Sequence, residues 1–275
     1  MEPRRKLLLA TDLTARSDRA TDRAVQLGTE AGAHVVALHV LEVDRPAHET
    51  GTGPAQRARQ ALQFDLAPVG DGLQIEVERG DPAERVLDVA HSHGCGLIVT
   101  GVARAERLGT TTLGKTVDRL LRTSDVPLLI VTDRPRRPYQ QIVVAVDFSD
   151  ASRVAVETAA RWFPGSPLTV FHAYDAPPVA AVTDPHRLHD EFRAAAQSSY
   201  AAFARDLAAT GSLMPMLRRG EPDQLLRELV AREASDLVVL GTHGRGRLFD
   251  ALIGSVARRI VTRLPCDALI VPHRR

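Results

Sequence analysis

Short runs of apolar, often β-branched residues alternate along this chain with longer segments in which apolar residues recur at helical spacing. Runs such as Lys6–Asp12 (KLLLATD) are almost continuously apolar, as strands are when helices cover both faces of a sheet. Alternation of such strands with helices is typical of a parallel sheet. The pattern therefore predicts an α/β fold.

The whole pattern occurs twice. KLLLATD at residues 6–12 recurs as QIVVAVD at residues 141–147. From Gly80, which matches Gly220, the two copies keep a constant offset of 140 residues. Self-similarity over this length indicates a duplicated domain. We expect five strands in each copy.

Residues 133–138 (DRPRRP) separate the copies and predict an exposed linker, because prolines interrupt both helices and sheets. We expect two domains, residues 1–132 and 139–275. Each is predicted to be a doubly wound, Rossmann-like sheet of five parallel strands. If the strand order is 3-2-1-4-5, ligands bind outside the carboxyl ends of strands one and four.

The loop after the fourth strand of the second copy has the spacing of a phosphate site. Residues 241–255 (GTHGRGRLFDALIGS) place glycines and a hydroxyl as Gly-x2-Gly-x9-Gly-Ser. Gly241 and Gly244 lack Cβ atoms where the backbone would approach a ligand, and Gly254 opens a helix whose free N–H groups would face an anion. Asp147 ends the first strand and would face this loop. The alternative is that the glycines only cap a strand and a helix.

At every defined position this loop resembles the ATP-binding pattern of the universal stress protein family, and the resemblance covers essentially the whole chain as two tandem domains. It implies a nucleotide-dependent regulatory protein of the stress response, without dedicated catalysis, that binds ATP with Mg²⁺ or Mn²⁺. By similarity, Asp147 would contact ribose or adenine, the backbone near Ala173 would contact adenine, and the loop would hold ribose and phosphates. His243 joins them because it lies inside the loop. The expected nucleotide-binding residues are Asp147, Ala173, Gly241, His243, Gly244, Arg245, Gly254, Ser255 and Val256.

The resemblance also implies that the two copies pack as a pseudo-dimer through their final strands, Leu128–Val131 against Ala268–Val271. Such pairing would cover two apolar edges that otherwise favour aggregation. A further homodimer and an unidentified protein partner are compatible with the sequence, although no motif indicates either.

The first copy carries a degenerate form of the loop. Gly101 and Gly114 match glycines of the second copy, but Arg104 stands in place of the second glycine and Lys115 in place of the serine. Because losing a glycine closes a backbone cradle, we favour a pocket that side chains fill and that binds no nucleotide. The alternative is that Arg104 and Lys115 bind an anion other than ATP.

Residues 109–116 (GTTTLGKT) also fit Gly-x4-Gly-Lys-Ser/Thr, the phosphate loop of P-loop NTPases. A true P-loop follows directly on its strand, whereas residues 102–108 separate this segment from the strand that ends at Gly101. The NTPase that this segment would imply, with Lys115 on the phosphates, is therefore kept as the alternative function and not as the main one. A third alternative is an interaction scaffold that binds no nucleotide.

Composition and charge give no support for binding to nucleic acid or to a membrane. The 35 basic and 34 acidic residues are interspersed and give a net charge of +1, so no field favours nucleic acid or an anionic membrane. No apolar run reaches the roughly 20 residues that span a bilayer, and the N-terminal sequence turns polar too early for a secretory signal. We expect a cytoplasmic protein whose two cysteines, Cys95 and Cys266, are reduced and buried.

No nucleophile elbow, catalytic triad or paired-carboxylate motif is visible, so we expect no dedicated enzyme. Slow hydrolysis of bound ATP needs only a metal and a positioned water. His91–Cys95 (HSHGC) offers three potential zinc ligands, but it matches a helix end and is interpreted as a polar helix terminus with a buried thiol. His39 and His172, at equivalent late-strand positions, are interpreted as structural.

Overall fold

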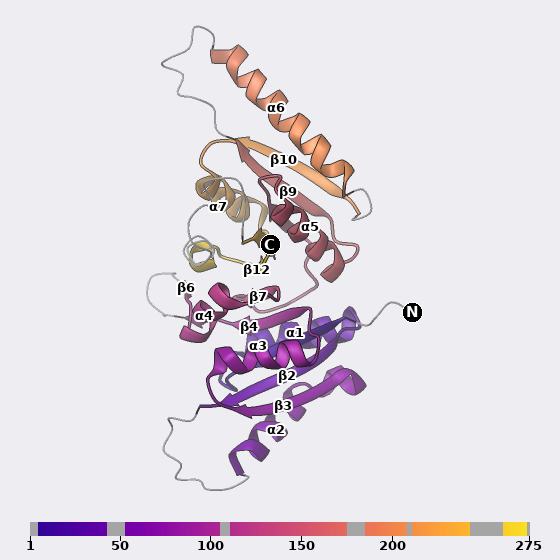
Figure 1. Ribbon diagram of the computed structural model, residues 1–275, viewed down its shortest axis with the longest axis vertical. Coiled ribbons are helices and arrows are strands. Elements are labelled where there is room, and N and C mark those ends of the chain that lie inside the picture. The colour runs from indigo at the N-terminus through magenta and orange to yellow at the C-terminus, as the bar shows by residue number, and fades with distance from the viewer. Residues whose placement is uncertain are drawn as a thin grey trace. The chain divides into compact units, whose positions relative to one another are not determined.

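The computed structural model describes residues 5–42, 53–104, 111–174, 185–207, 211–242 and 261–273. The chain divides into two compact units, Met1–Pro138 (unit 1) and Tyr139–Arg275 (unit 2). In each unit helices flank a sheet (Figure 1). None of the helices in the described ranges is long and apolar enough to cross a membrane.

In the described part of unit 1, five strands form one sheet in the order β7-β4-β1-β2-β3, and every neighbouring pair is parallel. The strands are β1 (Lys6–Thr11), β2 (His34–Leu41), β3 (Leu73–Arg79), β4 (Leu97–Gly101) and β7 (Leu128–Val131). Numbered along the chain, this is the order 3-2-1-4-5. The α/β fold predicted from the apolar runs is confirmed.

The helices of unit 1 are α1 (Asp18–Glu30), α2 (Gly53–Asp65), the 3₁₀ helix η1 (Ala67–Gly72), α3 (Pro82–Ser92) and α4 (Lys115–Thr123). The chain runs outward from β1 through β2 to β3 and then returns to β4. Because parallel crossovers are right-handed, helices before and after this return lie on opposite faces of the sheet. In agreement, α1 contacts η1 whereas α3 contacts α4.

Unit 2 repeats this topology in the order β10-β9-β8-β11-β12, again with parallel neighbours. Its strands are β8 (Ile142–Ala145), β9 (Leu168–Tyr174), β10 (Leu213–Arg219), β11 (Leu237–Gly241) and β12 (Asp267–Val271). Its helices in the described ranges are α5 (Asp150–Trp162), α6 (Pro185–Arg205) and α7 (Pro222–Glu233).

Equivalent helices begin at the same sequence signal in both units. Helix α3 starts at Pro82 and α7 at Pro222, each directly after an acidic residue. Proline is tolerated there because the first helical N–H has no partner inside the helix. The carboxylate of Asp81 accepts the N–H of Glu84 at 3.0 Å and so caps α3.

A short antiparallel ribbon lies between β4 and α4 of unit 1. Its strands are β5 (Ala103–Arg104) and β6 (Thr111–Thr112), with Arg104 opposite Thr111. We expected a plain loop here, because two-residue strands leave no periodic signal in a sequence. The segment that matches the phosphate loop of the second copy therefore contains paired backbone in unit 1.

Helix α1 holds the segment that follows β7. Arg19 donates to the carbonyl of Thr132 at 2.9 Å, and Arg23 donates to the carbonyl of Arg137 at 3.2 Å. Arg23 is only 5% exposed, so the second bond is largely shielded from water. The linker predicted from its prolines and arginines is exposed on most of its residues, but its backbone is tied to a helix of unit 1.

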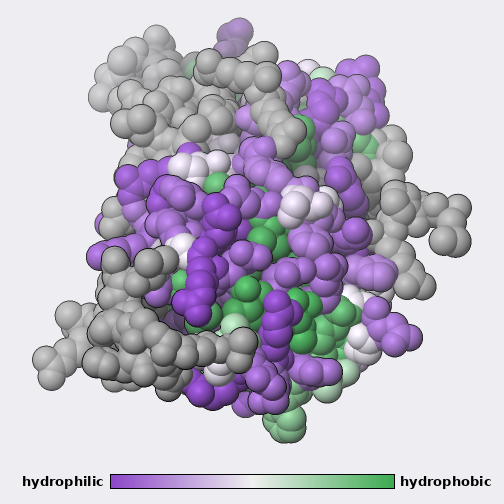
Figure 2. All heavy atoms as spheres, turned by 60° about the horizontal axis from the view of Figure 1, so that its bottom comes forward, coloured by the Kyte–Doolittle hydropathy of each residue, from purple (hydrophilic) through white to green (hydrophobic). Residues whose placement is uncertain are grey.

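The face shown in Figure 2 is mainly hydrophilic, with hydrophobic side chains gathered in smaller areas. Among the described residues, the large hydrophobic side chains that are well exposed are Phe64 (84%) and Met214 (44%). Isolated exposed hydrophobic residues are normal on a protein surface and indicate no binding site by themselves.

Candidate functional site

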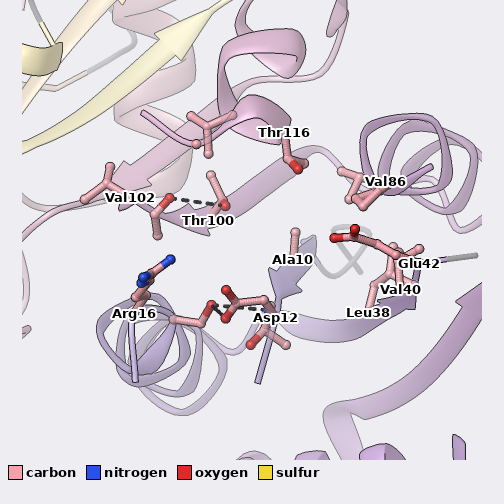
Figure 3. Close-up of a pocket in the computed structure, with 16 residues that line it drawn as sticks. Ala10, Asp12, Arg16, Leu38, Val40, Glu42, Val86, Thr100, Val102 and Thr116 are labelled. Carbon is pink, nitrogen blue, oxygen red and sulfur yellow. Dashed lines mark hydrogen bonds between the residues drawn. The ribbon is translucent and has the colours of Figure 1, made fainter. Parts of the chain in front are cut away.

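Unit 1 contains a cavity of about 230 Å³ outside the carboxyl ends of β1, β2 and β4 (Figure 3). It lies where the chain leaves β1 and β4 in opposite directions, which is the usual ligand position of an open α/β sheet. Its walls combine aliphatic side chains of β2, α3 and α4 with polar groups of the β1–α1 turn and of α4. The described residues thus leave space where we had favoured a pocket filled by side chains.

Asp12, in the turn after β1, presents a carboxylate to this cavity. Its Oδ1 atom accepts hydrogen bonds from the Thr14 N–H at 2.9 Å, the Thr14 hydroxyl at 2.7 Å and the Ser17 hydroxyl at 2.8 Å. Burial by itself would raise the pKa of Asp12, but these bonds and the charge of Arg16 hold that pKa below its ordinary value of 3.8. Within the described residues, Oδ2 accepts no hydrogen bond.

Three further polar side chains face the same space. Figure 3 shows Arg16, Glu42 and Thr116 around the cavity together with Asp12. The guanidinium of Arg16 forms no ion pair with any described residue. Helix α4 begins at the cavity wall with Gly114 as its N-cap and no side chain capping it, so its first N–H groups lack intrahelical partners.

Lys115 and Arg104 were the anion-binding candidates of this copy. Lys115 is exposed and does not line the cavity, although its neighbour Thr116 does. The side chain of Arg104 lies outside what the structure describes. The cation that the structure brings to the cavity is Arg16, which carries no sequence signal because its counterpart in the second copy is Ala151. Asp12, in contrast, could have been found from its match to Asp147.

Asp147 of unit 2 occupies the same kind of turn. Its Oδ1 atom accepts the Ser152 hydroxyl at 2.8 Å and the Ser149 N–H at 3.1 Å. The next residue, Phe148, has a positive φ of 61°, as Leu13 after Asp12 has 57°. Positive φ strains a residue with a Cβ, so its presence in both copies indicates that the turn is imposed by its surroundings.

Gly241 closes β11, directly beside β8 in the sheet, so it and Asp147 lie at the carboxyl ends of neighbouring strands. A Cβ at Gly241 would lie 3.0 Å from the carbonyl oxygen of Ala151 in α5. In unit 1 a Cβ at Gly101 would lie 2.8 Å from the carbonyl oxygen of Arg16. We had interpreted Gly241 as leaving room for a ligand. Close packing against α5 already favours glycine there.

Ala173 lies half-buried near the end of β9, next to His172. The Nδ1 atom of His172 lies 2.8 Å from the Val146 carbonyl, and since a carbonyl only accepts, Nδ1 carries the proton. Burial lowers the pKa of His172 below 6.5, against the opposing effects of this bond and of Asp147, so the ring is neutral at pH 7. His39 makes the same contact with the Thr11 carbonyl at 3.0 Å, which agrees with the structural interpretation of both histidines.

The remaining predicted nucleotide-binding residues lie outside the described residues. They are His243, Gly244, Arg245, Gly254, Ser255 and Val256. The structure therefore describes Asp147, Ala173 and Gly241 of the predicted set.

The P-loop interpretation of residues 109–116 fits the structure poorly. Gly109 and Thr110 lie outside the described residues, but Thr111–Thr112 is the strand β6 and pairs with β5. A phosphate cradle needs backbone N–H groups that converge on a ligand, and it follows directly on a parallel strand. Here an antiparallel ribbon separates β4 from the helix that begins at Lys115.

The histidines of the HSHGC segment bind different partners. His91 lies 2.6 Å from Asp125, and His93 lies 3.5 Å from Glu76. Burial raises the pKa of the Cys95 thiol to about 11, so this cysteine is protonated at neutral pH. In the ranges that the structure covers, no three His, Cys, Asp or Glu side chains form a group that could hold a metal ion.

A known protein family matches this chain once in each of its two copies. Residues 3–132 and 138–272 each match the model of the universal stress protein family. A universal stress protein of Mycolicibacterium smegmatis is 25% identical over 98% of this chain and 97% of its own length. Universal stress protein E of Escherichia coli K12 is 23% identical over 73% of this chain and 69% of its own. The crystal structure of a universal stress protein from Archaeoglobus fulgidus superposes with a TM-score of 0.73 at 17% identity, covering 97% of this chain and 98% of that one.

Proposed function

We propose that this chain, which belongs to the universal stress protein family, is a regulatory module whose second unit binds ATP. The observation that carries the proposal is the position of Asp147 and Gly241 at the carboxyl ends of the adjacent strands β8 and β11. The loop that follows Gly241 has the spacing Gly-x2-Gly-x9-Gly-Ser. A carboxylate and a glycine-rich loop at a topological switch point suit a ribose and its phosphates.

Different residues of unit 2 contact different parts of the nucleotide in this proposal. Asp147 is fixed by Ser149 and Ser152 through Oδ1, which orients its carboxylate for hydroxyl groups of the ribose. Ala173, at the end of β9, offers backbone groups for the adenine ring.

The loop residues of unit 2 hold the ribose and phosphates in this proposal. They are Gly241, His243, Gly244, Arg245, Gly254, Ser255 and Val256. Backbone N–H groups and one arginine are a donor set that fits phosphate oxygens. A bound Mg²⁺ or Mn²⁺ would neutralise part of the phosphate charge.

ATP acts in this proposal as a signal that alters conformation or partner choice, and not as a substrate of dedicated catalysis. Any hydrolysis would be slow, because no general base beside the loop is indicated by the sequence. We further propose a cytoplasmic location and a protein partner, with homodimerisation as an additional property.

Calorimetric titration of the full chain with ATP and magnesium tests the proposal. Wild type and Lys115→Ala are expected to bind equally, whereas Gly244→Arg abolishes binding because a side chain enters the cradle. Binding that survives Gly244→Arg and is lost in Lys115→Ala would restore the P-loop alternative. A wild type that does not bind at all would favour the scaffold.

A further inference from the structure

We propose that the cavity of unit 1 is a second ligand site, specific for a small sugar carrying one phosphate and not for ATP. The proposal does not depend on ATP binding in unit 2. It rests on the size of the cavity, on the charges that line it and on polar groups that lack partners among the described residues.

The charges that line the cavity suit one anionic group. Among the described residues that line it, Arg16 is the one cation, and Asp12 and Glu42 are the anions. Unit 1 has Arg104 and Lys115 at the loop positions of Gly244 and Ser255, which we propose hold the phosphates of ATP in unit 2. Glu42 adds a second carboxylate to this cavity, and like charges at short range repel a triphosphate. A single phosphate can be paired with Arg16.

The N-terminus of α4 adds neutral donors on the same wall. Gly114 caps the helix without a side-chain hydrogen bond, and Thr116 turns its hydroxyl toward the cavity. Free N–H groups at a helix start favour an anion, and here they coincide with an arginine that has no ion-pair partner in the described residues. The phosphate is therefore expected between Arg16 and α4.

The carboxylates define the rest of the ligand. Oδ1 of Asp12 is saturated by Thr14 and Ser17, which leaves Oδ2 without a donor from the described residues. Glu42 has no hydrogen bond or ion pair in the described ranges. Ionised carboxylates are acceptors only, so each can accept a hydrogen bond from a ligand donor. Sugar hydroxyls supply such donors without adding charge.

The buried end of the cavity also has unused hydrogen-bonding capacity. Thr100 is 7% exposed, and its hydroxyl donates to the carbonyl of Gly101 at 3.4 Å, its one hydrogen bond to a described residue. A hydrogen bond of that length is weak, so the Thr100 hydroxyl can donate to a ligand oxygen in place of the Gly101 carbonyl. The aliphatic wall of Leu38, Val40 and Val86 would face the C–H side of a sugar ring.

The volume between the described residues suits a small ligand. At about 230 Å³ the cavity lies below the roughly 300–1,000 Å³ that is common for drug-sized ligands. A phosphorylated pentose or hexose is a better match to this space than a nucleoside triphosphate.

Calorimetric titration of the full chain with ribose 5-phosphate tests the site, with inorganic phosphate and ATP as comparison ligands. The Gly244→Arg variant serves as the background, because it inactivates the proposed ATP site of unit 2. We expect one ribose 5-phosphate per chain, weaker binding of inorganic phosphate and no competition from ATP. Equal binding of inorganic phosphate, or displacement by ATP, would overturn the proposal.

Point variants locate the binding. Arg16→Ala is expected to weaken ribose 5-phosphate binding at least about tenfold, as loss of a charge-assisted hydrogen bond does. Asp12→Asn keeps the Oδ1 acceptor and should weaken binding similarly. Lys115→Ala is the matched control, since it removes a nearby exposed cation that does not line the cavity. The proposal is wrong if Arg16→Ala and Asp12→Asn bind ribose 5-phosphate with unchanged affinity, or if the Gly244→Arg background does not bind it. Either result would overturn the proposal even if ATP binds to unit 2 of the wild-type protein.

Discussion

The hydroxyl of Ser17 donates a 2.8 Å hydrogen bond to Oδ1 of Asp12, and Ser152 donates an equal bond to Asp147 in the second unit. In both units the serine lies five residues after the aspartate, on or beside the first turn of the helix that follows the first strand. The bond fixes a carboxylate at the carboxyl edge of the sheet, where an open α/β fold binds its ligands.

Replacing Ser17 by alanine is expected to raise the pKa of Asp12 toward 3.8 and to lower the free energy of unfolding by about 1 kcal/mol at neutral pH. A carboxylate whose folded pKa is depressed stabilises the fold above the unfolded pKa, and this contribution is lost as the pH falls through the folded pKa. The difference between Ser17→Ala and wild type should therefore shrink below pH 3.8. Urea unfolding at neutral and acid pH measures it.

Ser92→Ala is the control for that experiment, because the Ser92 hydroxyl donates to the Val89 carbonyl at 3.1 Å and touches no carboxylate. Its effect on stability should not vary with pH over the same range. If the stability difference between Ser17→Ala and wild type is also independent of pH, the Ser17 hydroxyl does not depress the pKa of Asp12.

Alanine at Gly101 or Gly241 is expected to destabilise the corresponding unit by about 1–3 kcal/mol, because its Cβ would lie 2.8 or 3.0 Å from a backbone carbonyl, that of Arg16 or Ala151. Gly72→Ala is a matched control, since its nearest neighbour would be at an ordinary 3.6 Å. Denaturant unfolding of the three variants measures the difference. A Gly101→Ala variant that unfolds like wild type would contradict the close approach of the β1–α1 turn to the end of β4.

Removing Arg23 should loosen the linker. In Arg23→Ala the carbonyl of Arg137 loses its 3.2 Å partner, so trypsin is expected to cut after Arg136 about fivefold faster, the change that roughly 1 kcal/mol produces. Limited proteolysis followed by mass spectrometry measures the rate. Arg187→Ala removes an exposed arginine whose 3.1 Å ion pair with Glu191 lies within α6 of unit 2, and it should be cut in the linker at the wild-type rate.

Cys95 should be inert to thiol reagents in the folded protein. Burial raises its pKa from 9.0 to about 11, which lowers the thiolate fraction at neutral pH by about 100-fold. A Cys266→Ser variant, in which Cys95 is the remaining cysteine, should react with a disulfide reagent at least that much more slowly folded than in urea. Equal rates would show that the thiol is accessible.

Much of the fold followed from the sequence because its signals are local. Continuous apolar runs indicated strands covered on both faces, and the proline at each of two equivalent helix starts, Pro82 and Pro222, began a helix in the structure. The strand order 3-2-1-4-5 of unit 1 is confirmed. The ribbon of β5 and β6 was missed, since strands of two residues have no periodicity to detect. The packing of the two copies through their final strands stays a prediction.

For the candidate sites, too, the sequence showed some features and the tertiary structure was needed for others. The match of Asp12 to Asp147 was visible in the sequence, and Gly101 and Gly241 were visible as glycines, but their reason was not. Contact with the carbonyl of Arg16 or Ala151 exists only once the turn or helix that follows the first strand packs across the end of the fourth.

The sequence by itself determined the duplication and the two α/β units, and it predicted the edge of the sheet at which we propose that ligands bind, because each depends on local patterns along the chain. The tertiary structure alone decided that the described residues of unit 1 leave a cavity and that Arg16, not Lys115, lines it. Those facts depend on where β1, β2, α3, β4 and α4 meet. Groups so distant in the chain become neighbours only through the crossover geometry of the sheet.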